Sequence, residues 1–209
     1  MLLVDVSGSR DCGTVNMLKK DIITEVAATL AFSTIQNNDK VGVIFFSDKI
    51  EKFIPPKKGK KHVLHIIREL LVFEPQSNKT DIGGALRYFS DAIKKHSTAF
   101  IISDFMDSGF DRTLMISNRK HDIAALQVYD IRESELPNVG LIKLKDAETG
   151  ERIWVDTADK RLRTSYKHAW NERQLELQKN LTQSGVDSVS MSTSDDYVRA
   201  LMKLFRLRA

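Results

Sequence analysis

The sequence predicts an α/β fold with a doubly wound, mostly parallel sheet and helices on both of its faces. Short apolar runs alternate along the chain with longer segments whose apolar residues recur every three or four positions. Several of these runs are almost uniformly apolar, as expected of strands that are covered on both faces. The 209 residues, 42% of them hydrophobic, are enough for one globular domain, and we assign residues 1–209 to it.

The chain begins with an apolar strand that ends at Asp5. A helix follows, whose apolar residues recur every four positions at Leu18, Ile22, Val26 and Leu30, and it should end near Asn38. The run Val41–Phe46 predicts a second buried strand. A turn leads from it into Ile50–Ile54, and the Pro55-Pro56 pair that closes this hairpin indicates an edge strand.

Three further helices and two further strands continue the alternation. The helix after Lys61 has an inward stripe formed by Val63, Ile67, Leu70 and Leu71. A helix from Ile82 to Lys95 then leads into the strand Ala99–Ile102. A short helix over Arg112–Asn118 leads into the strand Ile123–Tyr129.

The last third contains an expected hairpin insertion at residues 137–156, formed by Leu141–Leu144 and Arg152–Val155. Asp156-Thr157 should cap a long helix that Gly185 stops, and Val186–Val189 offers a last strand. We expect Ser194 to cap the closing helix, with an inward stripe formed by Val198, Leu201, Met202 and Phe205.

Polar oxygens follow the first strand in an alternating pattern. Asp5 ends the strand, and Ser7 and Ser9 lie in the loop that leaves it, with their side chains on the same side by alternation. Asp104 follows a later strand in the same way, and Thr80 lies in a loop that opens onto a helix. Because ligands of open α/β sheets bind beyond the carboxyl ends of the strands, we expect these five residues to converge.

Hydroxyl and carboxylate oxygens are hard ligands, which select Mg²⁺, Mn²⁺ or Ca²⁺ over zinc. If Ser7, Ser9 and Thr80 bind the ion directly and the carboxylates act largely through water, the ion keeps much of its positive charge. It then favours an anionic oxygen from outside, such as the Asp or Glu carboxylate of a protein partner. No evident nucleophile or tuned base accompanies the set, so we expect recognition rather than catalysis.

Composition restricts the setting in which the chain works. Cys12 is the only cysteine, so one chain can form neither an internal disulfide nor a thiolate cluster, and a reducing compartment fits. No apolar run approaches the roughly 20 residues of a membrane span, and no basic signal segment precedes the first strand. We therefore expect a cytoplasmic protein.

The segment Asp5-Val6-Ser7-Gly8-Ser9, with Thr80 and Asp104, resembles in order the metal-ion-dependent adhesion site of von Willebrand factor A domains. Over nearly its whole length the chain also resembles a bacterial family of unknown function whose members are often encoded beside MoxR-type AAA+ ATPases. The segments that carry this resemblance include Asn38–Gly42, Phe46–Asp48, Phe53–Gly59, Thr80–Ile82, Ile102–Phe105, His121–Ile123, Leu136-Pro137 and Glu148–Glu151.

The resemblance implies a metal-dependent interaction module, not an enzyme, that works with a MoxR-type AAA+ ATPase or its client in protein maturation or regulation. Carried over residue by residue, the metal set is Asp5, Ser7, Ser9, Thr80 and Asp104, with Asp81 at most behind it. Members of the family usually carry a substantial segment before the first strand, so we expect that the chain starts late. Arg10-Asp11 also departs from the family, and this charge pair can fill the open position of the ion from within.

Two other functions stay open. The same carboxylates suit a Mg²⁺-dependent phosphoryl-transfer or hydrolytic enzyme. The basic residues Lys57, Lys58, Lys60 and Lys61 suit nucleic acid, and the net charge of +4 weakly favours that function. Nucleic acid is the lesser alternative, because a charge run at a helix start is usually solvated and aromatic residues are not interleaved with it.

Overall fold

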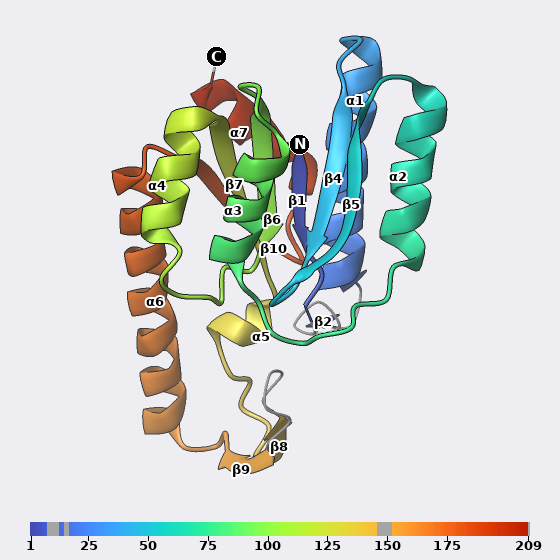
Figure 1. The fold of residues 1–209 in the computed structure, drawn as a ribbon. Coiled ribbons are helices and arrows are strands. Elements are labelled where there is room, and N and C mark those ends of the chain that lie inside the picture. Colours follow the sequence, from blue (N-terminus) through green and yellow to red (C-terminus); the bar gives the residue numbers. More distant parts are fainter. Residues whose placement is uncertain (8–12, 15–16, 146–151, 209) are drawn as a thin grey trace.

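The computed structural model of the chain describes residues 1–7, 13–14, 17–145 and 152–208. Its centre is a six-stranded sheet in the order β10-β7-β6-β1-β4-β5 (Figure 1). Neighbouring strands are parallel except β4 and β5, which are antiparallel at one edge. The bounds of the strands are β1 Leu2–Asp5, β4 Val41–Phe46, β5 Ile50–Lys57, β6 Thr98–Ser103, β7 Asp122–Tyr129 and β10 Asp187–Ser192. The predicted mostly parallel sheet is confirmed.

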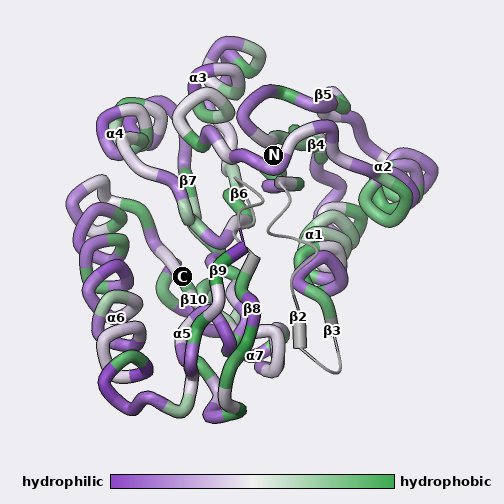
Figure 2. The backbone as a smooth tube through the Cα atoms, turned by 90° about the horizontal axis from the view of Figure 1, so that it is seen from below, coloured by the Kyte–Doolittle hydropathy of each residue, from purple (hydrophilic) through white to green (hydrophobic). Residues whose placement is uncertain are grey.

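Helices cover both faces of the sheet, and Figure 2 shows them as two layers. One core cluster joins Val4 and Phe45 to α1, α2 and α7, whereas the other joins Leu3 and Ile44 to α3, α4 and α6. Successive strand residues point to opposite faces, so the unbroken apolar runs supply both clusters. The bounds of the helices are α1 Lys19–Gln36, α2 Lys60–Val72, α3 Ile82–Ala92, α4 Asp111–Lys120, α5 Ile131–Ser134, α6 Lys160–Gln183 and α7 Tyr197–Leu207.

Two short antiparallel pairs lie outside the main sheet. One joins β2 (Gly13–Thr14) to β3 (Met17–Leu18), and the other joins β8 (Leu141–Lys145) to β9 (Arg152–Asp156). The second pair lies within the expected insertion and projects beyond α5, at the end of the molecule where β1 and β6 finish (Figure 1). The first pair and α5 were not predicted, because two-residue strands and a four-residue helix carry no readable periodicity.

The edge strand β5 continues through Pro55 and Pro56 to Lys57, three residues beyond the prediction. Proline lacks an amide hydrogen, and it is tolerated on edge strands and beside irregularities in the pairing. The register between β4 and β5 shifts at Gly42. A Cβ atom there would lie 2.6 Å from the carbonyl oxygen of Ile54, so the two strands can approach only over a glycine.

The predicted caps of the last two long helices are wrong by a few residues. Asp159, not Asp156-Thr157, caps α6 by accepting a hydrogen bond of 2.7 Å from the amide of Arg161. Asp196, not Ser194, caps α7. Each stretch offers several Asp, Ser or Thr residues in close succession, and the apolar period does not choose among them.

The predicted inward stripes of two helices are partly wrong. In α2, Ile66 is fully buried, whereas Leu71 is 60% exposed. In α7, Leu204 is fully buried, whereas Met202 and Phe205 are about half exposed. Apolar residues occupy more than one side of both helices, so contact with the sheet decides which side is covered.

A buried histidine lies at the edge of the sheet opposite to Asp5. His121 follows α4, is 2% exposed, and packs against Phe89 with ring centroids 4.3 Å apart. Neither of its ring nitrogens has a hydrogen-bond partner among the described residues. Burial, together with the nearby charges of Lys120 and His96, lowers the pKa of His121.

Within the described ranges, no helix is long and apolar enough to cross a membrane.

We expect His121 to make folding sensitive to acid. Its folded-state pKa lies below the unfolded value of 6.5, so its contribution to stability is complete above about pH 6.5 and is lost as the pH falls below that value. Urea unfolding of the native chain and of His121→Phe, from about pH 7.5 to about pH 5, measures this effect. The variant should lose less stability over that range, and equal losses would contradict the prediction.

Candidate metal centre

The candidate metal centre lies at the carboxyl edge of the sheet, where β1 and β6 end side by side. Val4 pairs with Ile102 in parallel register. The chain therefore reaches Asp5 and Ser103 at the same level of the sheet, and Asp104 one residue later. Two carboxylates far apart in the sequence thus meet at one edge, as the strand ends predict.

A loop between α2 and α3 brings Thr80 to the same edge. The amide of the next residue, Asp81, donates a hydrogen bond of 2.9 Å to the carbonyl oxygen of Ser47, at the end of β4. The Asp81 carboxylate caps α3 by accepting from the amide of Gly84 at 2.6 Å, and it lies 3.5 Å from Arg87. Asp81 therefore fixes the loop and does not support the metal set directly.

The Asp5 carboxylate accepts hydrogen bonds from the hydroxyl groups of the centre. It is 3% exposed, and its Oδ1 accepts a hydrogen bond of 2.9 Å from the amide of Ser7. Its Oδ2 accepts from the hydroxyl of Ser103 at 2.6 Å and from that of Thr80 at 3.5 Å. The Ser7 hydroxyl also donates to this carboxylate. Asp5, Ser7 and Thr80 are therefore together, whereas the predicted ligand Ser9 lies outside the described residues.

Both carboxylate oxygens of Asp104 also accept hydrogen bonds from the protein. It is 4% exposed, and its Oδ1 accepts from the amide of Met106 at 3.1 Å. Between these two residues Phe105 adopts a φ of 57°, a left-handed conformation that costs a non-glycine residue about 1–3 kcal/mol. Such strain is concentrated at functional sites. The second oxygen of Asp104, Oδ2, accepts from the Lys19 ammonium at 2.8 Å.

Lys19 is a buried cation inside the centre that was not predicted from the sequence. Its side chain is 1% exposed, and its Nζ lies 2.8 Å from Asp104 and 2.6 Å from Glu133 of α5. The spacing of α1 does indicate burial of Lys19, because Lys19 lies three residues before Ile22 and seven before Val26 and so falls on the buried stripe of the helix. A lysine on such a stripe needs acidic partners, but the sequence does not show which carboxylates reach it.

The charges in the centre shift one another's pKa values. Burial, reinforced by the nearby negative charge of Asp104, raises the pKa of Asp5 to about 6, although hydrogen bonds from Ser103 and Ser7 oppose the rise. Burial alone would lower the pKa of Lys19, but attraction to Asp104 and Glu133 outweighs it and the net pKa is raised. Burial also raises the pKa of Glu133.

The donor set fits a hard divalent cation. Each carboxylate oxygen of Asp5 and Asp104 already accepts a hydrogen bond from the protein, which favours contact with an ion through water. The hydroxyls of Ser7 and Thr80, beside Asp5, are the ligands suited to direct contact. Among the described residues, no three His, Cys, Asp or Glu side chains form a cluster that could hold a metal. Arg10-Asp11, expected beside the ion, lies outside those residues.

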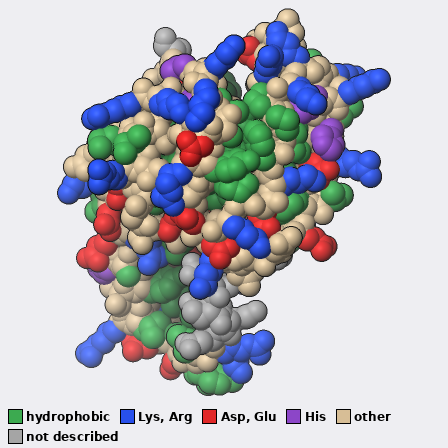
Figure 3. Space-filling view, viewed as in Figure 1, with side chains coloured by type: hydrophobic (Ala, Val, Ile, Leu, Met, Phe, Trp, Pro, Cys, Tyr) green, Lys and Arg blue, Asp and Glu red, His purple; other side chains and the backbone are tan. Residues whose placement is uncertain are grey.

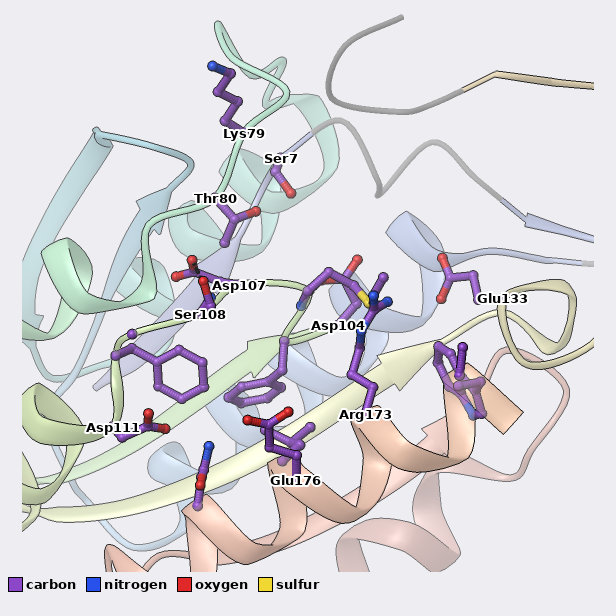
Figure 4. A pocket seen from close by; sticks show the side chains of 18 of the residues that line it. Ser7, Lys79, Thr80, Asp104, Asp107, Ser108, Asp111, Glu133, Arg173 and Glu176 are labelled. Atoms are coloured by element: carbon purple, nitrogen blue, oxygen red, sulfur yellow. Dashed lines mark hydrogen bonds between the residues drawn. The ribbon is translucent and has the colours of Figure 1, made fainter. Parts of the chain in front are cut away.

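A groove of about 770 Å³ opens from the candidate metal centre. Ser7, Thr80 and Asp104 line one end of it, and side chains of α6, among them Arg173 and Glu176, line the wall opposite (Figure 4). A ligand in the groove can therefore reach the centre from outside.

The basic run lies away from this groove. Lys57 ends β5, Lys58 follows it, and Lys60 and Lys61 begin α2; all four are exposed. Because β5 runs antiparallel to β4, these residues lie at the edge of the sheet opposite to the centre. On the face shown in Figure 3, Lys and Arg side chains are spread among acidic ones. This arrangement does not favour a nucleic-acid surface at the centre.

The family described as "Protein of unknown function DUF58" matches residues 1–176. The relatives include Uncharacterized protein Rv1480 of Mycobacterium tuberculosis and Uncharacterized protein Mb1516 of Mycobacterium bovis, each 25% identical over 210 residues that cover 99% of this chain. The chain spans 66% of the length of these two relatives. Uncharacterized protein MAV169 of Mycobacterium avium is 24% identical over 158 residues, which are 74% of this chain and 93% of that relative.

Two solved structures share the fold over nearly the whole chain. The conserved hypothetical protein BatB from Bacteroides thetaiotaomicron superposes with a TM-score of 0.65 at 15% identity, covering 99% of this chain and 96% of its own. The von Willebrand factor A domain of SpRpn10 superposes with a TM-score of 0.52 at 11% identity, covering 99% and 92%. At these identities the likeness concerns the fold alone, and it confirms the predicted fold class.

We expect Lys19→Met to be strongly destabilising without divalent metal. The change leaves the buried Asp104 and the partly buried Glu133 without their cation, which costs about 3–5 kcal/mol of unfolding free energy. The matched control is Lys20→Met, one residue along α1, which removes none of the ion pairs found among the described residues. Its unfolding free energy should stay within about 0.5 kcal/mol of that of the native chain. Urea unfolding in EDTA measures both variants, and similar losses would show that the buried pairs do not matter.

Asp5→Asn should gain stability relative to the native chain as the pH rises. The Asp5 pKa of about 6 in the folded protein exceeds the ordinary 3.8, so folding favours the neutral acid, and that advantage is lost between about pH 4 and pH 6. Two pKa units correspond to about 3 kcal/mol. Unfolding of both proteins in EDTA across this range gives the difference, which a pH-independent offset would contradict.

Proposed function

Because the chain belongs to the DUF58 family of proteins of unknown function and has a von Willebrand factor A-like fold, we propose that it is a divalent-metal-dependent protein-binding module. In this proposal the hydroxyls of Ser7, Ser9 and Thr80 hold Mg²⁺, or Mn²⁺ or Ca²⁺ in its place, and Asp5 and Asp104 support it through water. The ion supplies a positive site that captures an acidic side chain of a protein partner.

The hydrogen bonding of the two carboxylates is the observation that carries the proposal. Asp5 and Asp104 are buried, and protein donors hold every one of their oxygens. Carboxylates fixed in this way neutralise an ion less than direct ligands do. Lys19 offsets one of the two negative charges, so a divalent ion would retain positive charge for an outside carboxylate.

We propose binding rather than catalysis. A pKa of about 6 would suit a general base, but a base must reach the proton that it removes. Asp5 is 3% exposed, and Ser103, whose hydroxyl donates to it at 2.6 Å, is fully buried. Neither group is open to a substrate, which disfavours the phosphoryl-transfer and hydrolytic alternatives.

We further propose that the acidic side chain belongs to a MoxR-type AAA+ ATPase or to one of its clients, in protein maturation or regulation. This step rests on the resemblance of segments such as Phe53–Gly59 to proteins encoded beside such ATPases. Nucleic acid is a weaker candidate partner, because the exposed lysines of β5 and α2 lie at the opposite edge of the sheet.

Calorimetric titration with Mg²⁺ and with Mn²⁺ after treatment with EDTA tests the metal. We expect the native chain to bind, and Thr80→Val to weaken binding by about tenfold or more, because valine keeps the shape of the side chain and removes the hydroxyl ligand. The matched control is Thr164→Val on the exposed side of α6, which should bind like the native chain. No heat of binding by the native chain, or equal affinity of Thr80→Val, would refute the proposed site.

A further inference from the structure

The groove beside the candidate metal centre is lined by both acidic and basic side chains. One end is formed by Ser7, Thr80 and Asp104, where the proposed ion would bind, and the wall opposite is formed by α6. Its volume of about 770 Å³ lies within the range of about 300–1,000 Å³ that is typical of binding pockets. A partner whose carboxylate reaches the centre therefore has room to continue along α6.

Arg173 places a second cation close to the centre. Its side chain is exposed, and its Nη1 donates to the sulfur of Met106 at 3.4 Å, which is a weak acceptor. In the portion of the chain that is described, the Arg173 guanidinium has no carboxylate partner. Figure 4 shows it reaching from α6 toward Asp104. It is therefore available to a second carboxylate, or to the same one that the ion holds.

Two acidic side chains line the groove away from Ser7 and Thr80. Glu176 lies one helical turn beyond Arg173, and Asp111 begins α4 across the groove (Figure 4). Neither forms an ion pair within the described ranges. Asp111 has a structural role, because a carboxylate in the first turn of a helix interacts favourably with its dipole. Glu176 is exposed near the middle of α6, where no such role applies.

Apolar side chains also line the groove. Phe105, Phe110 and Trp170 line the groove, although they are only 3%, 3% and 8% exposed. A floor of this kind suits one apolar side chain of a bound segment and supplies the water exclusion that strengthens the flanking charge pairs.

We propose that the groove binds an extended segment of the protein partner in one direction, with an acidic residue at the metal centre and Arg173 and a basic residue at Glu176 and Asp111. An apolar residue between them packs over Phe105. This inference rests on the proposed function, because the ion provides the anchor for the acidic residue. The reverse direction would place a basic residue against the ion and Arg173, and an acidic residue against Glu176 and Asp111.

Selection from a displayed library of random peptides by the purified chain in Mg²⁺ tests the direction. We expect metal-dependent binders in which an acidic residue, an apolar residue and a basic residue occur in a fixed order. Fluorescence anisotropy then compares an enriched peptide with one in which the acidic and basic residues are exchanged. The enriched peptide should bind about tenfold more tightly, the effect of one well-formed interfacial charge pair.

The decisive variant is Glu176→Lys, with Glu172→Lys as the matched control. Both residues are exposed on α6, but only Glu176 lines the groove. In Glu176→Lys, the affinity advantage of the peptide that carries the basic residue should fall by about tenfold, whereas Glu172→Lys should retain that advantage. Both variants should bind Mg²⁺ like the native chain. Identical peptide preferences of the two variants, or no metal-dependent peptide at all from a chain that binds Mg²⁺, would overturn the groove proposal alone. A native chain that binds no divalent metal would overturn the proposed function as well.

Discussion

The buried ion pair between Lys19 and Asp104 is the interaction on which the candidate site depends. It removes an ammonium group almost completely from water, at a desolvation cost of several kcal/mol that only close acidic partners can offset. Asp104 and Glu133 supply those partners from the end of β6 and from α5. The pair thus ties the start of α1 to both segments and fixes one carboxylate of the site.

The remaining parts of the centre follow from the sheet. β1 lies between β4 and β6, so Asp5 ends in the middle of the carboxyl edge and is shielded from solvent on both sides. Hydroxyl groups from Ser7, Ser103 and Thr80 satisfy its oxygens, and the strained Phe105 turns the chain so that Met106 can satisfy Asp104. The result is a pair of fixed, buried carboxylates next to the hydroxyls of Ser7 and Thr80, with a groove opening from this site.

Much of this architecture could be predicted from the sequence, because buried strands and amphipathic helices have strong periods. The same strand ends predict that Asp5 and Asp104 lie together, and the loop of Thr80 meets Asp5 as expected. Lys19 could not be placed, because its partners come from segments 85 and 114 residues further along the chain. The caps Asp159 and Asp196 failed for a local reason, since neighbouring Asp, Ser and Thr residues compete for the same role.

The most direct measurement is a crystal structure of the chain with Mn²⁺, because the anomalous signal of manganese locates the ion independently of its coordination. We expect an anomalous peak next to the hydroxyls of Ser7 and Thr80, with Asp5 and Asp104 linked to it through water and Lys19 still paired with Asp104. The absence of a peak at saturating Mn²⁺, or a peak reached only by displacing Lys19 from Asp104, would contradict the account of the centre given above.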